Sequence, residues 1–99
     1  MKHAGADALD QLEPLLEKLR GRALKEKSRG TFYRGSAAFL HFHEDPAGLF
    51  ADLKLAGDFT RFRVSTQAER AALLREVTRE LATAPAKPAA RSRDTRRGA

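Results

Sequence analysis

The chain has 99 residues, 41% of them hydrophobic and 32% charged, and it contains no cysteine. This length fits one domain with a single modest core. The absence of cysteine excludes disulfides and thiolate metal sites and is typical of a reducing compartment, so we expect a cytoplasmic protein. No apolar run approaches the roughly 20 residues of a membrane span, and Met1 to Asp7 lack the apolar core of a signal peptide, so we expect no membrane association.

The formal net charge of +6 is unevenly distributed along the chain. Residues 84–99 hold five basic residues and one acidic residue, whereas residues 1–83 hold 14 basic and 12 acidic residues. The chain is therefore a nearly balanced body followed by a basic tail. Because the tail has no large apolar residue, it cannot bury enough surface to fold, and we expect residues 84–99 to be disordered.

The first helix is predicted by an apolar stripe at 3-4 spacing. Its members are Leu9, Leu12, Leu16, Leu19 and Ala23. We expect the helix to start near Asp10, because Pro14 then lies at the edge of the first turn, and to end at Gly21. Residues 1–7 precede this stripe and are expected to be disordered.

The second helix is predicted over residues 66–82. Thr66 and Glu69 have the spacing of a capping box at its start. The buried stripe of this helix would consist of Leu73, Leu74, Val77 and Leu81.

Four short segments between the helices are predicted strands, at about residues 31–34, 37–44, 49–55 and 60–64. Gly35 and the segments 45–48 and 56–58 supply turns between them, while residues 22–30 form a charged connector. The order α-β-β-β-β-α predicts an α+β domain over residues 8–83. In this two-layer domain, an antiparallel meander of three or four strands carries the N- and C-terminal helices on one face.

The strand register follows from keeping the apolar residues on one face. Glu44 then opposes Leu49, and Leu55 opposes Thr60 in the next hairpin, although a slip of two residues there would preserve the same faces. His41, Asp52 and Arg63 would form a row across the outer face, where Asp52 is expected to raise the pKa of His41. The predicted outer face consists of Phe39, His41, His43, Phe50, Asp52, Lys54, Arg61 and Arg63.

Two interpretations treat this outer face as a binding surface. In the first, the surface binds nucleic acid: aromatic and basic side chains on a sheet are typical of such binding, with Phe39, Phe50 and His41 stacking on bases. Phosphates would then be contacted by Lys54, Arg61 and Arg63. In the second, the exposed Phe39 and Phe50 form an interface with a protein partner or a second copy of the chain.

A third interpretation is a metal or acid–base site at His41, His43 and Asp52. A catalytic zinc usually takes three protein ligands, and His3 lies in the N-terminal segment expected to be disordered, so we expect neither a metal nor another cofactor. No suitable nucleophile, phosphate-binding loop or dinucleotide fingerprint accompanies the pair. We therefore expect a domain that is not an enzyme.

The run from Glu26 to Leu40, followed by a strand ladder and a closing helix, resembles the MmcQ/YjbR-like proteins, which are small, mostly uncharacterised bacterial proteins. The resemblance covers roughly residues 12–82 and depends mainly on Gly35 and Phe39; the chain is shorter than these proteins and lacks their usual downstream tryptophan. It implies a two-layer α/β domain and, through similarity in fold to domains proposed to bind DNA, favours nucleic acid as the ligand. It implies no catalytic residue.

Overall fold

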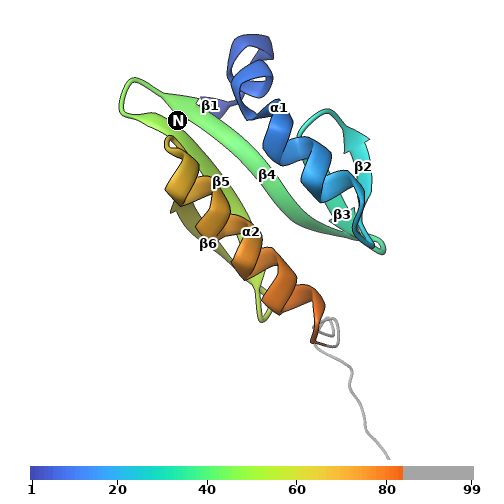
Figure 1. Ribbon diagram of the computed structural model, residues 1–99. Coiled ribbons are helices and arrows are strands. Elements are labelled where there is room, and N and C mark those ends of the chain that lie inside the picture. The colour runs from blue at the N-terminus through green and yellow to red at the C-terminus, as the bar shows by residue number, and fades with distance from the viewer. Residues whose placement is uncertain (84–99) are drawn as a thin grey trace, which may run out of the picture.

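The computed structural model describes residues 1–83, which form two helices and six strands (Figure 1). The predicted basic tail lies outside the described residues. In chain order, the elements are β1 (Lys2–His3), α1 (Ala6–Arg20), β2 (Lys25–Ser28), β3 (Thr31–Arg34), β4 (Ala37–Asp45), β5 (Gly48–Leu55), β6 (Asp58–Arg63) and α2 (Gln67–Leu81).

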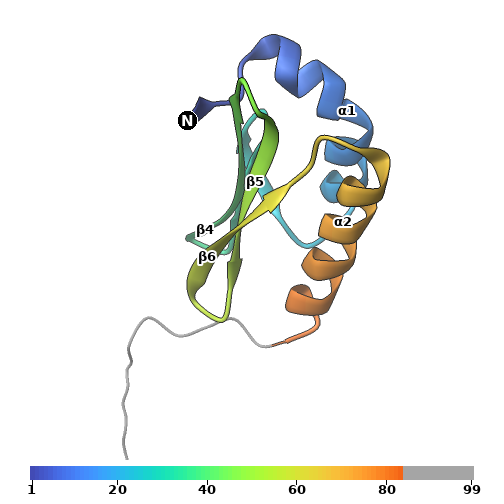
Figure 2. The same ribbon diagram turned by 90° about the vertical axis from the view of Figure 1, so that its left-hand side faces the viewer.

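The strands form one antiparallel sheet in the order β2-β3-β4-β5-β6, and β1 pairs with β4. Both helices lie on the same face of this sheet, so that the opposite face is left open (Figure 2). The predicted α+β architecture with two helices on one face of a meander is therefore confirmed. Neither helix among the described residues is long and apolar enough to cross a membrane.

β4 organises the sheet because it pairs along both of its edges. One edge contacts β5, and the other contacts first β3 and then β1, which places His3 opposite His43. The N–H of Ala4 donates to the carbonyl of Phe42, and the N–H of Gly5 donates to the Glu44 carboxylate. The expectation that residues 1–7 are disordered is therefore wrong: sheet hydrogen bonds, which no local pattern predicts, hold this segment.

The first helix and the predicted connector also depart from expectation. α1 begins at Ala6 instead of near Asp10, because a hydrogen bond to Glu44 already holds the preceding Gly5 against the sheet. Pro14 therefore lies inside the helix, at an exposed position. The helix ends at Gly21 as predicted. Part of the expected connector forms β2, which pairs with β3.

The second helix closely follows the prediction. The Thr66 hydroxyl accepts from the Glu69 N–H at 3.1 Å, while the Glu69 carboxylate accepts from the Thr66 N–H at 3.0 Å. This reciprocal capping box satisfies two backbone donors that the helix itself leaves free. Leu73 and Val77 are fully buried, and Leu74 and Leu81 pack at the margin of the core.

The hydrophobic core lies between the sheet and the two helices. α1 contributes the largest helical share, and β3, β4 and β5 supply most of the sheet's contribution. Each fully buried Leu or Phe stabilises the fold by about 1.5–3 kcal/mol. The core side chains are Ala8, Leu12, Leu15, Leu16, Leu19, Phe32, Phe39, Leu40, Phe42, Leu49, Ala51, Leu53, Val64, Leu73 and Val77.

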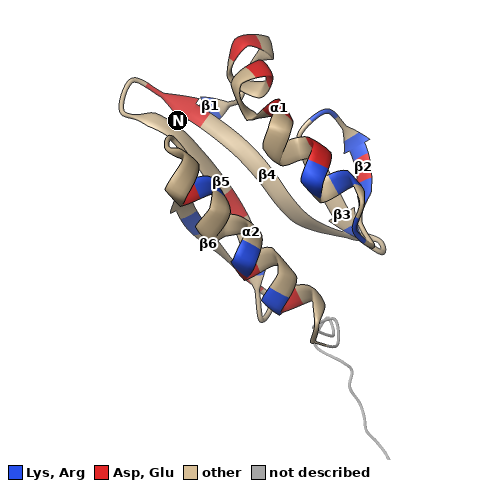
Figure 3. Ribbon diagram, viewed as in Figure 1, with Lys and Arg blue, Asp and Glu red and all other residues tan. Residues whose placement is uncertain are grey.

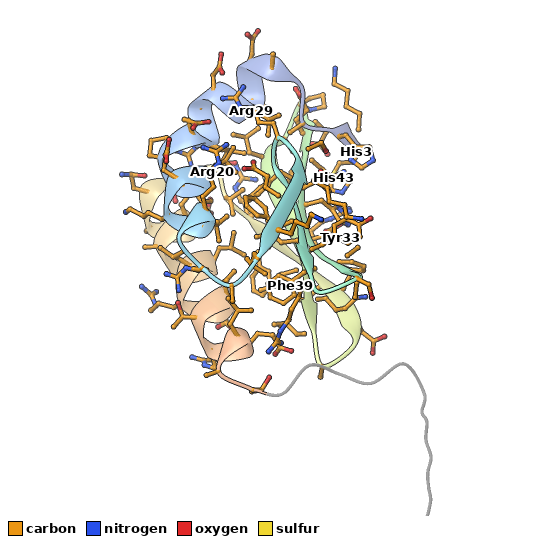
Figure 4. The ribbon with its side chains drawn as sticks, turned by 90° about the vertical axis from the view of Figure 1, so that its right-hand side faces the viewer. His3, Arg20, Arg29, Tyr33, Phe39 and His43 are labelled. Atoms are coloured by element: carbon orange, nitrogen blue, oxygen red, sulfur yellow. The ribbon has the colours of Figure 1, made fainter. Side chains whose placement is uncertain are left out.

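A network of charged side chains ties α1 to the β2–β3 hairpin. Arg20 donates to Glu26 and to Glu13, both at 2.6 Å, and Arg29 donates to Glu13 at 2.8 Å. Hydrogen bonds from Arg29 and Arg20 lower the pKa of Glu13 to about 2. Figure 4 shows Arg20 and Arg29 on the helical side of the sheet. The other Glu26 oxygen accepts from the N–H of Gly30 at 2.9 Å, which holds the hairpin turn against the helix.

Gly30 should be intolerant of a side chain, whereas Gly21 should accept one. Gly30 has a φ of 81°, and a Cβ built on it would lie 2.7 Å from a Leu9 methyl group. The left-handed conformation alone costs about 1–2 kcal/mol for a non-glycine residue. We expect Gly30→Ala to lower the free energy of unfolding by about 2 kcal/mol or more in urea denaturation.

Gly21→Ala is the matched control for that experiment. Its φ is −80°, and a Cβ there would meet no atom within 4 Å. It should be neutral or stabilising by up to about 1 kcal/mol. Equal effects of the two substitutions would show that the turn at Gly30 is not as constrained as described.

Candidate functional site: the open face of the sheet

The candidate site is the open face, which we define as the side of the sheet opposite the helices. Its centre is set by the β4–β5 register, in which His41 opposes Asp52 and His43 opposes Phe50. This register is the one predicted from the apolar pattern, and it is confirmed along the whole hairpin. In Figure 4, His3, His43 and Tyr33 lie on this side of the sheet.

The predicted register of the β5–β6 hairpin is wrong by two residues. Leu55 pairs with Asp58 instead of Thr60, and Asp52 pairs with Arg61 instead of Arg63. The turn consists of two residues only, Ala56 and Gly57, with φ values of 51° and 95°. Two-residue hairpin turns of type I′ need positive φ at both central positions and usually contain Asn-Gly, so Ala-Gly did not indicate that the predicted turn at 56–58 has only two residues.

Phe39 does not lie on the open face, contrary to prediction. It is 3% exposed and belongs to the core together with its neighbour Leu40. Phe32 pairs with Leu40 while Tyr33 pairs with Ala38, so β4 carries one extra residue at this point. Such a bulge breaks the strict alternation of side chains, and the two consecutive apolar residues both turn inward.

The structure adds residues to the open face that the sequence prediction omitted. Phe59 is 44% exposed, and its ring centroid lies 5.0 Å from that of His41. Tyr33 and the lysines Lys25 and Lys27 come from β3 and β2. The alternation of Phe32 and Tyr33 could have indicated Tyr33, whereas Phe59 joins the surface only because of the shorter turn.

Three histidines gather on this face. His3 stacks on His43 with ring centroids 4.8 Å apart, and His41 meets the edge of His43 at 4.9 Å. Nδ1 of His41 and Nε2 of His43 are 2.9 Å apart. One potential ligand atom from each histidine lies within 4.8 Å of the others, which makes the trio a possible metal-binding group.

Asp52 lies directly beside this cluster. Its carboxylate accepts from Nε and Nη2 of Arg61, both at 2.8 Å, and its Oδ2 lies 3.2 Å from Nε2 of His43. Asp52 and His43 are 8% and 9% exposed, although both lie on the open face. The hydrogen bonds from Arg61 hold the pKa of Asp52 below its ordinary value, so the carboxylate is charged at neutral pH.

The pKa of His41 is lowered, which contradicts the prediction that Asp52 would raise it. Burial among its neighbours is the main cause, and the nearby His43 adds to it. Asp52 acts in the predicted direction but with a smaller effect, because its charge is directed at Arg61.

Each of three aromatic rings on the open face has a cation over it. Lys27 lies 4.4 Å from the Tyr33 ring centroid, Lys54 lies 5.1 Å from that of Phe59, and Arg63 lies 5.8 Å from that of Phe50. The face thus combines π surfaces with adjacent positive charges.

A scan against protein-family models, a search of curated proteins and a search of solved structures each found no match. The resemblance to the MmcQ/YjbR-like proteins therefore stays a prediction.

Stability should depend on pH through His41. A lowered folded-state pKa means that the unfolded chain, with an ordinary value near 6.5, binds this proton more readily. The neutral His41 side chain therefore gives the fold its full stability above about pH 6.5. The free energy of unfolding then decreases as the pH falls from there toward the folded-state pKa of His41. We expect urea denaturation to show a free energy of unfolding that decreases from about pH 7.5 to 5.5.

The matched variant is His41→Gln, which keeps a polar side chain but cannot titrate. Its stability should change less over the same interval, because it lacks the imidazole whose lowered folded-state pKa causes the decrease. An unchanged slope in the variant would contradict the assignment to His41.

Proposed function

We propose that this domain binds single-stranded nucleic acid on the open face of the sheet. The observation that carries the proposal is the repeated pairing of a partly exposed aromatic ring with a Lys or Arg, at Tyr33, Phe59 and Phe50. Bases stack on such rings irrespective of sequence, while the adjacent cations contact phosphates. The cations already lie at the rings, so they need only turn outward to follow a bound backbone.

The distribution of charge over the two faces supports this choice of ligand. Acidic and basic residues alternate along α1 and α2, as Figure 3 shows, whereas within residues 1–83 the open face has two acidic residues, Asp45 and Asp52, against five basic ones. Asp52 is occupied by Arg61. The basic residues of the open face are Lys25, Lys27, Lys54, Arg61 and Arg63. The nearly neutral body therefore presents one positive surface.

The contact residues differ from those expected from sequence. Arg61 is held by Asp52, and Nε of Arg63 lies 3.5 Å from the Glu69 carboxylate. Lys25, Lys27 and Lys54 are therefore the open-face cations that remain for phosphates. Phe59 and Tyr33 take the stacking role that was expected of Phe39. An open sheet favours single strands, because splayed bases can lie flat on it while a duplex exposes only base edges.

The proposal predicts that loss of open-face lysines weakens binding. In the full chain, the double substitution Lys27→Ala and Lys54→Ala should reduce affinity for a labelled single-stranded DNA or RNA pool by about tenfold in fluorescence anisotropy. It should also lower the slope of affinity against salt concentration by about 1.5–2, as expected for two lost phosphate contacts. Phe59→Ala should weaken binding by about 1–3 kcal/mol without changing that slope.

The matched control is Lys18→Ala with Arg75→Ala, which removes the same charge from exposed positions on the two helices. This variant should bind nearly as the parent chain does. A second control replaces the five basic residues of 84–99 with glutamine and measures the contribution of the tail. Equal losses of affinity for the lysine pair and its control would show that binding is nonspecific electrostatic attraction. A dimer in sedimentation that Phe59→Ala dissociates would favour self-association through the open face instead.

A further inference from the structure

We propose that His3, His41 and His43 together hold one divalent transition-metal ion of the kind that imidazole prefers, with Zn²⁺ as the reference case. Imidazole nitrogen is a common ligand of zinc, and three protein ligands with one open position are typical of non-structural zinc sites. This site is independent of nucleic-acid binding, and it can be tested without nucleic acid.

The spacing of the rings suits a shared ion. Two nitrogens on one tetrahedral zinc lie about 3.3 Å apart, given Zn–N bonds of about 2.0–2.1 Å. His41 Nδ1 and His43 Nε2 are already 2.9 Å apart. His3 offers a nitrogen within 4.8 Å of the other two, and its side chain is exposed, so it can move inward without disturbing the core.

The backbone arrangement explains why these three rings meet. His41 and His43 lie two residues apart on β4 and therefore project from the same face. His3 pairs directly with His43 through β1, which places its side chain on that face as well. Two of the ligands therefore lie on a strand that is paired on both edges, and the third comes from a short edge strand.

Asp52 is the fourth protein group at the site. Its Oδ2 lies 3.2 Å from His43 Nε2, close enough to complete the coordination sphere or to bind a metal-bound water. Arg61 fixes the carboxylate through two hydrogen bonds, and a ligand whose orientation is fixed in advance loses less freedom on binding.

His43 presents its Nε2 to the site, because this atom lies beside His41 Nδ1 and Asp52 Oδ2. Its Nδ1 is buried on the other side of the ring and has no hydrogen-bond partner within residues 1–83.

The test uses the full chain without a polyhistidine tag. Isothermal titration with Zn²⁺ should show one ion per chain, and the visible spectrum of the Co²⁺ form should show the intense bands of tetrahedral coordination. His3→Gln, His41→Gln and His43→Gln should each weaken Zn²⁺ binding at least about tenfold, since even the loss of an outer-shell partner costs 10–100-fold. Lys2→Gln, next to His3 in β1, is the matched control and should bind as the parent does.

The pattern among the variants decides the outcome. Loss of Zn²⁺ binding in His3→Gln alone would assign the ion to the N-terminal segment. Loss in His41→Gln and His43→Gln but not in His3→Gln would leave a contact with two histidines. Either result overturns the proposal. No binding at millimolar Zn²⁺ also overturns it. Because His43 is buried and its variant could misfold, imidazole NMR signals of the parent chain provide the second measurement: all three rings should shift together up to one equivalent of Zn²⁺.

Discussion

The pairing of β4 with β5 is the constraint on which the rest of the structure depends. Leu40 and Phe42 on one strand and Ala51 and Leu53 on the other must face the helices together, and the observed register achieves this with a tight turn after Asp45. Because side chains alternate, this burial also determines the open face. The positions of His41, His43 and Asp52 are consequences of core packing.

The length of β4 then decides what can join the sheet. The strand extends beyond β3, and the free part of its edge is taken by β1, whose pairing satisfies backbone groups that would otherwise form an exposed edge. This pairing brings the N-terminal segment to the open face and allows α1 to begin at Ala6. An edge strand of two residues is held by few hydrogen bonds, so binding of His3 to a shared ion would stabilise β1 as well as the site.

The open face has a central cluster of histidine and charged side chains, surrounded by aromatic rings with adjacent cations. At its centre, the nearly buried His43 and Asp52 lie side by side, and the exposed Arg61 donates two hydrogen bonds to the Asp52 carboxylate. Around this centre, Tyr33, Phe59 and Phe50 remain partly exposed under their cations. The proposed metal and nucleic-acid sites thus use different residues of the same surface, and a bound divalent ion would add positive charge to it.

Sequence reasoning succeeded where a local pattern had one physical solution. The capping box at Thr66, the end of α1 at Gly21 and the β4–β5 register all follow from residues close together in the chain. It failed at the bulge of Phe39, where two consecutive apolar residues both face the core, and at the Ala-Gly turn, where two registers bury the same face. A two-residue slip costs nothing in apolar burial, so the pattern could not choose between Arg61 and Arg63 as the partner of Asp52.

By itself, then, the sequence determined the α+β class, the helical coverage of one sheet face and the presence of His41 and His43 on the other, because periodicity is a local property that burial enforces. Only the tertiary structure decided that His3 joins them, that Phe59 replaces Phe39 on the open face and that Arg61 holds Asp52. Each of these depends on contacts between residues far apart in the chain or on the backbone geometry of a turn. Neither long-range contacts nor turn geometry produce a periodic pattern in the amino-acid sequence.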